Sequence, residues 1–388
     1  MTHRCPLPVW LALFALFSLV LRPAQADEPP PALAASAWLL VDHHSGQVLA
    51  AHNPGQKVEP ASLTKIMTAY VVYGALRDGR LKPDQVVPVS ETAWKAPGSR
   101  MFIDPRQRVT VDALISGMVI QSGNDATIAL AEAVAGNEAA FVNLMNAEAR
   151  RLGMNDTHFT NATGLPDDAH LTTARDLIRL TTALIRDFPE DYKRNSVREF
   201  TWNKITQPNR NRLLWLDPAI DGVKTGHTKS AGFCLIASRD EGARRLTAVV
   251  LGAASDQARV QEMLALLQYG GRAFAAVKLY DAGQALSQLK VYKGKRATVG
   301  AGFERDFVVS LPTSLANALA GGADGRLKVE VASRQPLVAP VKRGDAIATL
   351  RLTLDDKPWG EFPLVALADV PVAGILGRAW DELKLMLQ

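Results

Sequence analysis

Two short polar groups in the first third of the chain have types and spacings suited to nucleophilic chemistry. Ser62 and Lys65 stand three positions apart at the start of a helical pattern, so the hydroxyl and the amine share one helix face. A serine hydroxyl is a weak nucleophile, and a deprotonated amine beside it can take its proton. The pair alone is weak evidence, because Ser287 and Lys290 repeat the same spacing. Ser122-Gly123-Asn124 then places a hydroxyl and an amide at a helix break, where they either point into a cleft or serve as a helix N-cap.

Lys224-Thr225-Gly226 is a third polar group and the most specific one. A lysine and a threonine at a strand edge offer a charge and a hydroxyl to a carboxylate. The glycine that follows them allows another backbone to approach closely. The three groups together are much stronger evidence than any one of them, because they occur in the order Ser-x-x-Lys, Ser-x-Asn, Lys-Thr-Gly, the motif set of penicillin-recognising serine acyl-enzymes. Ser287 and Lys290 come after the third group and do not fit this order.

The sequence closely resembles the low-molecular-mass penicillin-binding proteins that are D-alanyl-D-alanine carboxypeptidases. The resemblance covers essentially the whole chain after its first 26 residues. The segments that carry it are 60–68, 122–126, 161–165, 209–215 and 221–228. It implies a transpeptidase-like α/β (α+β) domain, a β-rich domain behind it and an amphipathic helix at the end.

The resemblance also implies a role for each motif residue. Ser62 would be the acyl-accepting nucleophile and Lys65 the base that takes its proton. Positive charge from Lys224 and partial burial would both lower the Lys65 pKa. Ser122 and Asn124 would relay the proton to the leaving D-alanine and hold the peptide amide.

Substrate binding falls to the third group and its neighbours. Lys224 and Thr225 would bind the terminal carboxylate, beside Gly226. The backbone N–H groups of Ser62 and His227 would form the oxyanion hole. Two basic residues match positions near the family's carboxylate site, with exposed surface arginines as the alternative interpretation: Arg210 and Arg259.

Three functional interpretations follow. The leading one is a serine D,D-carboxypeptidase that removes the terminal D-alanine of peptidoglycan pentapeptide stems and is acylated by β-lactams. A D,D-endopeptidase or weak β-lactamase on the same site is the alternative, and a catalytically silent wall-binding protein is the third. The stretch Thr157–Asp176 has no Glu to activate a deacylating water, and Asp167 and Asp168 suit a solvated turn. We therefore expect a persistent penicilloyl enzyme, and we expect no metal and no cofactor, because the histidine spacings fit no ligand motif.

The elements that must position these groups begin with a hairpin over 38–50. Helical patterns cover 61–76, 111–120, 126–135, 138–152 and 173–188, followed by strands near 233–238 and 246–252 and a helix over 257–269. This order predicts an antiparallel sheet built from both ends of the domain, with a helical cluster against it. After about residue 286 short β-branched runs predict a small all-β domain. We expect domains at 27–283 and 284–371.

Both ends of the chain indicate targeting. A basic start, the apolar run Val9–Leu21 and Ala24-Gln25-Ala26 predict a signal peptide over residues 1–26, with an uncleaved anchor as the alternative. Residues 372–388 show an apolar stripe at helical spacing, which predicts an amphipathic helix lying on a membrane surface or docked on the protein. We expect a periplasmic protein held to the outer face of the inner membrane. The formal net charge of +5, without long charge runs, argues against nucleic acid as a partner.

Overall fold

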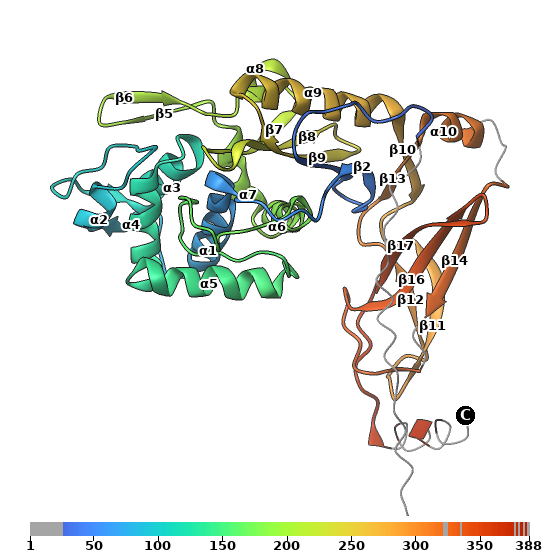
Figure 1. Cartoon of the computed structure of the whole chain (residues 1–388). Helices are drawn as coiled ribbons and strands as arrows, with labels where there is room; N and C mark the ends of the chain where they lie inside the picture. Colours follow the sequence, from blue (N-terminus) through green and yellow to red (C-terminus); the bar gives the residue numbers. More distant parts are fainter. Residues whose placement is uncertain are drawn as a thin grey trace, which may run out of the picture.

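The computed structural model describes residues 26–320, 325–333 and 336–375, and also 378, 381, 382 and 385. Two units follow each other along the chain: a first unit over 26–273 and a β-rich unit from 274 onward. The β-rich unit extends away from one end of the first unit (Figure 1).

A five-stranded antiparallel sheet forms the centre of the first unit. Its strands are β1 (Ala37–Asp42), β2 (Val48–His52), β7 (Ile220–Thr228), β8 (Gly232–Asp240) and β9 (Arg245–Ala253). Their spatial order is β2-β1-β9-β8-β7, so the two ends of the unit meet in the middle of the sheet. The predicted sheet built from both ends is therefore confirmed.

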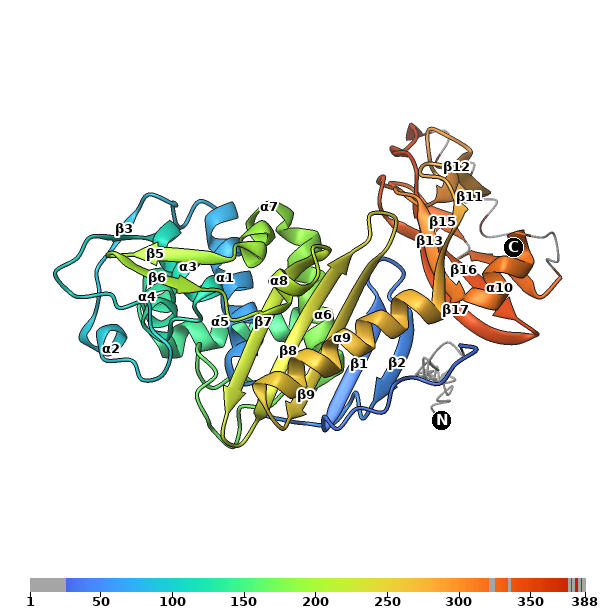
Figure 2. The same cartoon turned by 90° about the horizontal axis from the view of Figure 1, so that it is seen from above.

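Both faces of this sheet are covered. Helix α9 (Asp256–Ala273) lies across one face, and the helical cluster covers the other (Figure 2). Along β1 the side chains alternate accordingly: Leu40 packs in the core beneath α9, whereas Leu39 and Val41 pack in the core of the helical cluster. The two-residue period of a strand explains this alternation. It also explains why β1 is apolar throughout.

The helical cluster supplies most of the site. Its α-helices are α1 (Lys65–Arg77), α2 (Glu91–Trp94), α3 (Val111–Ile120), α4 (Asn124–Ala135), α5 (Glu138–Arg151), α6 (Ala174–Asp187) and α7 (Pro189–Tyr192). The short helix α8 (Leu213–Leu216) lies on the other face of the sheet and packs in the core beneath α9. The 3-10 helices of the cluster are η1 (Ala61–Thr64) and η2 (Lys193–Ser196). Two antiparallel strand pairs complete it: β3 (Val86–Val87) with β4 (Val109–Thr110), and the hairpin of β5 (Glu199–Trp202) with β6 (Ile205–Pro208). Side chains at several N-caps set the helix starts; Thr173, for example, accepts from the backbone N–H of Asp176.

The β-rich unit contains a six-stranded sheet and a separate strand pair. The sheet order is β14 (Leu327–Ser333), β16 (Ala346–Leu354), β17 (Lys357–Ala366), β12 (Thr298–Gly302), β11 (Ala285–Tyr292) and β15 (Leu337–Val338). The pair is β10 (Phe274–Tyr280) with β13 (Phe307–Pro312). Because β10 pairs with β13, this unit begins before the boundary expected at residue 283. It also contains a short helix, α10 (Thr313–Ala320), that the sequence pattern did not predict.

The two units meet at a polar seam. Ser310 of β13 donates to the carboxylate of Asp42 at 2.6 Å, and Arg244 donates to the Phe274 carbonyl at 2.8 Å. Asp42, Arg244 and Ser310 are all buried. A strand end of the first unit is thereby tied to the β-rich unit.

The predicted targeting segments lie mostly outside the described residues. Residues 1–25 of the expected signal peptide and most of 376–388 are not described. Just before the tail, the backbone N–H of Ala373 donates to the Lys293 carbonyl at 2.8 Å. Lys293 in turn donates its backbone N–H to the Asp381 carboxylate at 2.7 Å. Within the described ranges, no single helix is long and apolar enough to cross a membrane; α4 and α5 reach that measure only as a pair bent by 83°.

Candidate active site

Ser62 and Lys65 meet at the junction of η1 and α1. The side chain of Lys65 donates from Nζ to Ser62 Oγ at 3.0 Å and to the carbonyl oxygen of Thr163 at 2.6 Å. Ser62 lines a cleft of about 610 Å³, while only 1% of Lys65 is exposed. The hydroxyl therefore faces substrate and the amine lies behind it.

Burial makes the Lys65 amine unusual. The Lys65 pKa is lowered to about 7: burial is the largest cause, the positive charge of Arg210 adds to it, and Asp125 opposes both effects. The charged form is disfavoured because Lys65 has lost its hydration. Two details go beyond the sequence-based expectation: Lys65 is completely rather than partly buried, and Arg210 adds to the positive charge around it. The repulsion between Lys65 and Lys224 is present as well.

Close backbone packing holds the turn that carries Ser62. Ala61 has a φ of +47°, a left-handed conformation that a residue other than glycine adopts at a cost. A Cβ on Gly164 would lie 1.8 Å from the Ala61 carbonyl oxygen, and a Cβ on Gly226 would lie 3.0 Å from the Pro60 oxygen. Both glycines are therefore needed so that their backbones can press against this turn.

Ser122 and Asn124 lie on the connection between α3 and α4. Ser122 is buried, lines the cleft and has a φ of +68°. The N-cap of α4 is Gly123 and no side chain caps it, so the N-cap interpretation of this motif is wrong. Asn124 donates from Nδ2 to the Pro97 carbonyl at 2.6 Å, while its buried Oδ1 has no hydrogen-bond partner among the described residues.

The third motif lies on β7, the edge strand of the sheet. Lys224 and Thr225 are buried, and Thr225, Gly226 and His227 line the cleft. Burial lowers the pKa of Lys224, and the positive charges of Lys65 and two arginines lower it further. A carboxylate arriving beside these cations would offset that repulsion.

Arg210 and Arg259 both line the cleft but have different partners. Arg210 donates from Nε to the Gln121 carbonyl at 3.1 Å, and within the described ranges no carboxylate pairs with it. Arg259 is buried, forms an ion pair with Asp256 and donates to the Gly226 carbonyl at 3.2 Å. The Arg210 guanidinium is thus able to bind an incoming anion, whereas the Arg259 guanidinium is already bonded to the strand beside Ser62.

Phe233 joins two of these residues, and the sequence motifs gave no sign of it. It is the cross-strand partner of His227 on β8, and their rings stack with centroids 3.9 Å apart. The Arg259 guanidinium lies over the same ring, 5.6 Å from its centroid. One aromatic side chain therefore supports both His227 and Arg259 at the cleft wall.

The loop 157–176 contacts the segment that carries Ser62 and Lys65. The Asn161 side chain accepts from the backbone N–H groups of Thr163, Gly164 and Leu165, which shapes the turn that presents the Thr163 carbonyl to Lys65. His170 bonds to Thr64 Oγ1 at 2.8 Å, and burial lowers its pKa to about 4. Sequence reasoning marked 161–165 only as a matching segment, because no local pattern says that a carbonyl there will meet Lys65.

A nucleophilic serine beside a buried amine, on a helical cluster packed against an antiparallel sheet, defines a serine hydrolase of the transpeptidase-like fold. The family model described as D-alanyl-D-alanine carboxypeptidase matches residues 24–255. The model described as penicillin-binding protein 5, C-terminal domain, matches residues 274–372. The chain belongs to the D-alanyl-D-alanine carboxypeptidase family.

Individual proteins support the same assignment. The chain is 40% identical to D-alanyl-D-alanine carboxypeptidase DacC of Escherichia coli over 378 residues, which is 95% of this chain and 92% of the relative. It is 38% identical to penicillin binding protein 5 from Haemophilus influenzae, whose crystal structure aligns with a TM-score of 0.77 over 89% of this chain and 99% of that one. A penicillin-binding protein of Listeria monocytogenes, solved in its ampicillin-bound form, is 30% identical and aligns with a TM-score of 0.57 over 62% of this chain and 98% of that one.

Proposed function

We propose that this site removes the terminal D-alanine from peptidoglycan stem peptides, with Ser62 as the nucleophile and Lys65 as its base. One observation carries the assignment: Lys65 Nζ lies 3.0 Å from Ser62 Oγ, and its pKa is lowered to about 7. Such an amine is partly neutral near pH 7 and can accept the hydroxyl proton, which an ordinary lysine cannot. The strained turn at Ala61 holds the hydroxyl at the cleft.

The reaction has two steps. In the first, Ser62 Oγ bonds to the carbonyl carbon of the penultimate D-alanine, and the bond from that carbon to the nitrogen of the terminal D-alanine breaks. The hydroxyl proton passes to Lys65 and through Ser122 to the leaving nitrogen, so D-alanine departs as an amine. In the second, water bonds to the acyl carbon and the Ser62 oxygen leaves with a proton. The backbone N–H groups of Ser62 and His227 are the proposed oxyanion donors in both steps.

Carboxylate recognition is assigned to Lys224, Thr225 and Arg210. Arg210 has the free capacity for an incoming anion, and Lys224 is a buried cation on the neighbouring strand. The unpartnered amide oxygen of Asn124 is available to a backbone N–H of the substrate. Arg259 is not assigned a direct contact with the carboxylate, because its guanidinium already bonds to Asp256 and to the Gly226 carbonyl.

β-Lactams should acylate the same serine and leave slowly. The loop 157–176 contains no glutamate, and Asp167 and Asp168 are exposed in its turn. The decisive experiment measures D-alanine release from a pentapeptide beside penicillin hydrolysis. We expect release of one D-alanine per peptide, and a labelled penicillin retained on the protein. Fast penicillin turnover would favour a β-lactamase. Cleavage of cross-linked dimers alone would favour an endopeptidase, and a protein that penicillin does not label would be a silent wall-binding protein.

We further propose that the protein is periplasmic and held to the membrane by residues 372–388. The support is the sequence: an apolar N-terminal run before a small-residue cleavage site, and an apolar stripe in the tail whose charges cancel. Apolar burial should then dominate binding at about 0.025 kcal/mol per Å², with little help from anionic lipid.

Vesicle binding tests this attachment. Deleting 372–388 should release an active, soluble enzyme, and replacing Leu383 and Leu387 with Asp should do the same. Replacing Arg378 and Lys384 with Gln is the matched control and should leave most of the protein bound. Full-length protein that stays in the supernatant, or that 1 M salt strips as completely as the deletion does, would refute the anchor.

A further inference from the structure

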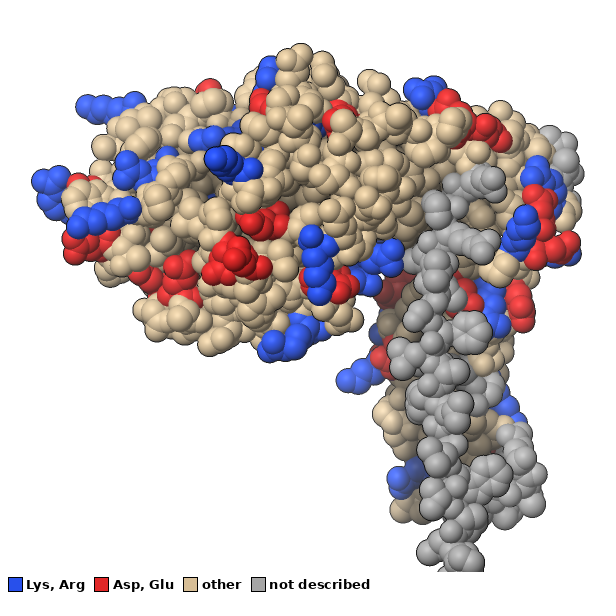
Figure 3. Space-filling model, viewed as in Figure 1, with Lys and Arg blue, Asp and Glu red and all other residues tan. Residues whose placement is uncertain are grey.

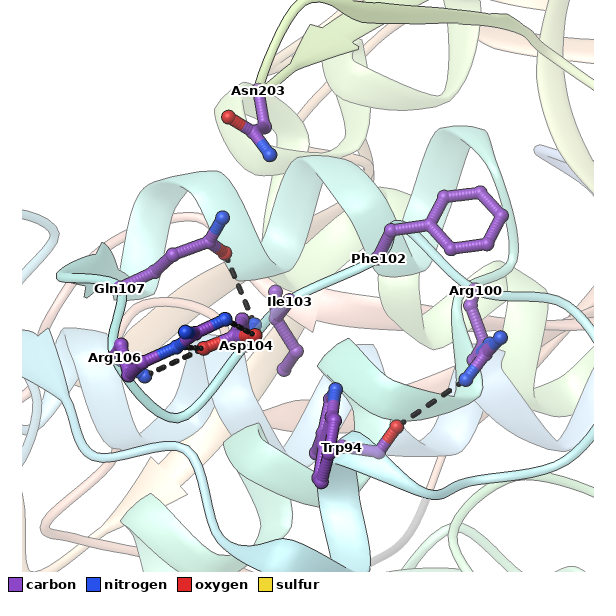
Figure 4. A pocket seen from close by; sticks show the side chains of 8 residues that line it. All are labelled: Trp94, Arg100, Phe102, Ile103, Asp104, Arg106, Gln107 and Asn203. Carbon is purple, nitrogen blue, oxygen red and sulfur yellow. Dashed lines mark hydrogen bonds and ion pairs between the residues drawn. The ribbon is translucent and has the colours of Figure 1, made fainter.

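A second pocket adjoins the active-site cleft. Figure 4 shows it between the loop that carries Phe102 and Arg106, the end of α2 and the tip of the β5–β6 hairpin, and its volume is about 340 Å³. Ser99 lines the cleft while the next residue, Arg100, lines the second pocket. Gln207, which also lines the cleft, donates from Nε2 to the Arg100 carbonyl at 3.2 Å. The two hollows therefore share one wall.

Aromatic side chains are exposed in this pocket. Phe102 is 44% exposed and Trp94 is 40% exposed. Phe102 also has a φ of +67°, a left-handed conformation that is costly for a bulky residue. The backbone N–H groups of Met101, Phe102 and Ile103 impose it by donating to the carboxylate of Asp125 at 3.0, 2.8 and 3.2 Å. The residue that follows Asn124 of the active site thus presents the Phe102 ring to solvent.

The pocket also holds a cation without a carboxylate. The Arg100 guanidinium lies 5.3 Å from the centroid of the Phe102 ring and donates to the Trp94 carbonyl at 3.4 Å. In the part of the chain that the structure describes, no acidic side chain pairs with Arg100. Arg106, by contrast, is neutralised by Asp104 through two contacts of 2.9 Å. Figure 3 shows both basic and acidic side chains at this end of the first unit, so the attraction for an anion comes from the Arg100 guanidinium itself.

We propose that this pocket binds a carboxylate-bearing residue of the stem peptide, upstream of the D-alanyl-D-alanine end. The carboxylate would form a charge-assisted, bidentate pair with Arg100, and the aliphatic part of the residue would lie against Phe102 and Trp94. The inference rests on the proposed function, because it names the substrates that the same active site prefers. Acidic stem peptides are then better substrates than neutral ones.

Three substrates and two matched variants test the pocket. The substrates are an acidic pentapeptide, the same peptide with its upstream carboxylates amidated, and an N-acyl-D-alanyl-D-alanine dipeptide too short to leave the cleft. Arg100→Gln should lower kcat/KM for the acidic peptide about tenfold more than for the other two. The control, Arg108→Gln, changes an exposed arginine of the same loop that does not line the pocket, and it should treat all three substrates as the wild type does.

A second variant tests the aromatic wall. Phe102→Asn keeps a residue that tolerates the left-handed backbone and removes the ring. It should raise KM for both pentapeptides and leave the dipeptide unaffected. Equal losses on all three substrates, or no loss in either variant, would overturn the pocket assignment. A wild-type protein that releases D-alanine from none of the three would instead refute the proposed function.

Discussion

The Ser-x-x-Lys spacing occurs in both units, and its two settings behave differently. Ser62 and Lys65 lie one helical turn apart, which brings Nζ within 3.0 Å of Oγ. Ser287 and Lys290 lie on β11, where residues three apart point to opposite faces of the sheet. Lys290 Nζ instead lies over the Tyr292 ring, 4.6 Å from its centroid. The same residue types are therefore reactive only where a helix holds them together.

Burial of polar groups separates the units as well. Among the described residues, the first unit buries many polar and charged side chains, whereas the β-rich unit buries Ser310 at the seam. Burying Lys65, Asp125 and Lys224 costs free energy that an apolar core does not. The catalytic unit bears that cost because burial lowers the Lys65 pKa and positions the motifs, while the β-rich unit is built on apolar packing.

The largest effect is expected when the nucleophilic serine is replaced, and the serine at the matching position in the β-rich unit serves as its control. Ser62→Ala should lower D-alanine release by about a thousandfold or more and abolish the penicillin adduct, because no other group can form the acyl bond. Ser287→Ala, its match in the β-rich unit, should change neither. Mass spectrometry of the labelled peptides checks both, and an adduct on Ser287 would contradict the assignment.

The lysines of the two Ser-x-x-Lys pairs, Lys65 and Lys290, give the second prediction. Lys65→Arg should reduce penicillin acylation by about a thousandfold, since a guanidinium stays protonated and cannot act as the base. Lys290→Arg should acylate like the wild type. Stopped-flow labelling measures both rates. If Lys65→Arg were acylated at a near wild-type rate, Lys65 would be structural and another base would have to exist.

The next largest loss of activity is expected when a closely packed glycine of the active site is replaced. A Cβ on Gly226 would lie 3.0 Å from the Pro60 oxygen and 3.2 Å from the Ser62 nitrogen, so Gly226→Ala should shift the nucleophile and lower kcat/KM about 10–100-fold. In the β-rich unit, a Cβ on Gly300 would lie 3.1 Å from the Ala285 Cβ. Gly300→Ala should therefore lower Tm without lowering kcat/KM. The comparison fails if both variants lose activity equally.

The acylation rate should also depend on pH. Lys65 must be neutral to accept a proton, and its pKa is lowered to about 7, so the rate should rise with pH through that value. Between pH 6 and pH 8 the neutral fraction increases about tenfold, and a plateau should follow. Penicillin labelling across this range measures the profile. A flat profile, or a rate that falls as pH rises, would exclude Lys65 as the titrating base.

The smallest effect on activity is expected at the seam. Ser310→Ala leaves the buried Asp42 carboxylate without its hydroxyl donor, so the free energy of unfolding should fall by about 1–3 kcal/mol while kcat stays unchanged. Urea unfolding and D-alanine release measure the two quantities separately. A parallel loss of kcat would mean that the β-rich unit contributes to the geometry of the cleft.

Local pattern was enough to predict most of the elements. The pattern over 111–120 matches α3, and that over 173–188 matches α6 with Thr173 as its N-cap. Periodicity and capping are properties of neighbouring residues, so they can be read without a fold. Where pairing is long-range the prediction was less accurate: β10 pairs with β13, which moves the start of the β-rich unit back to Phe274.

The sequence by itself determined the three motifs, their order and hence the family, because those are identities and spacings along the chain. Only the tertiary structure decided how the groups act on each other. It adds Arg210 to the charges that lower the Lys65 pKa, bonds Arg259 to the Gly226 carbonyl, and sets Phe233 beside His227. Desolvation and Coulomb interactions depend on distances between residues that are far apart in the chain, and those distances exist only once the sheet and the helical cluster have packed.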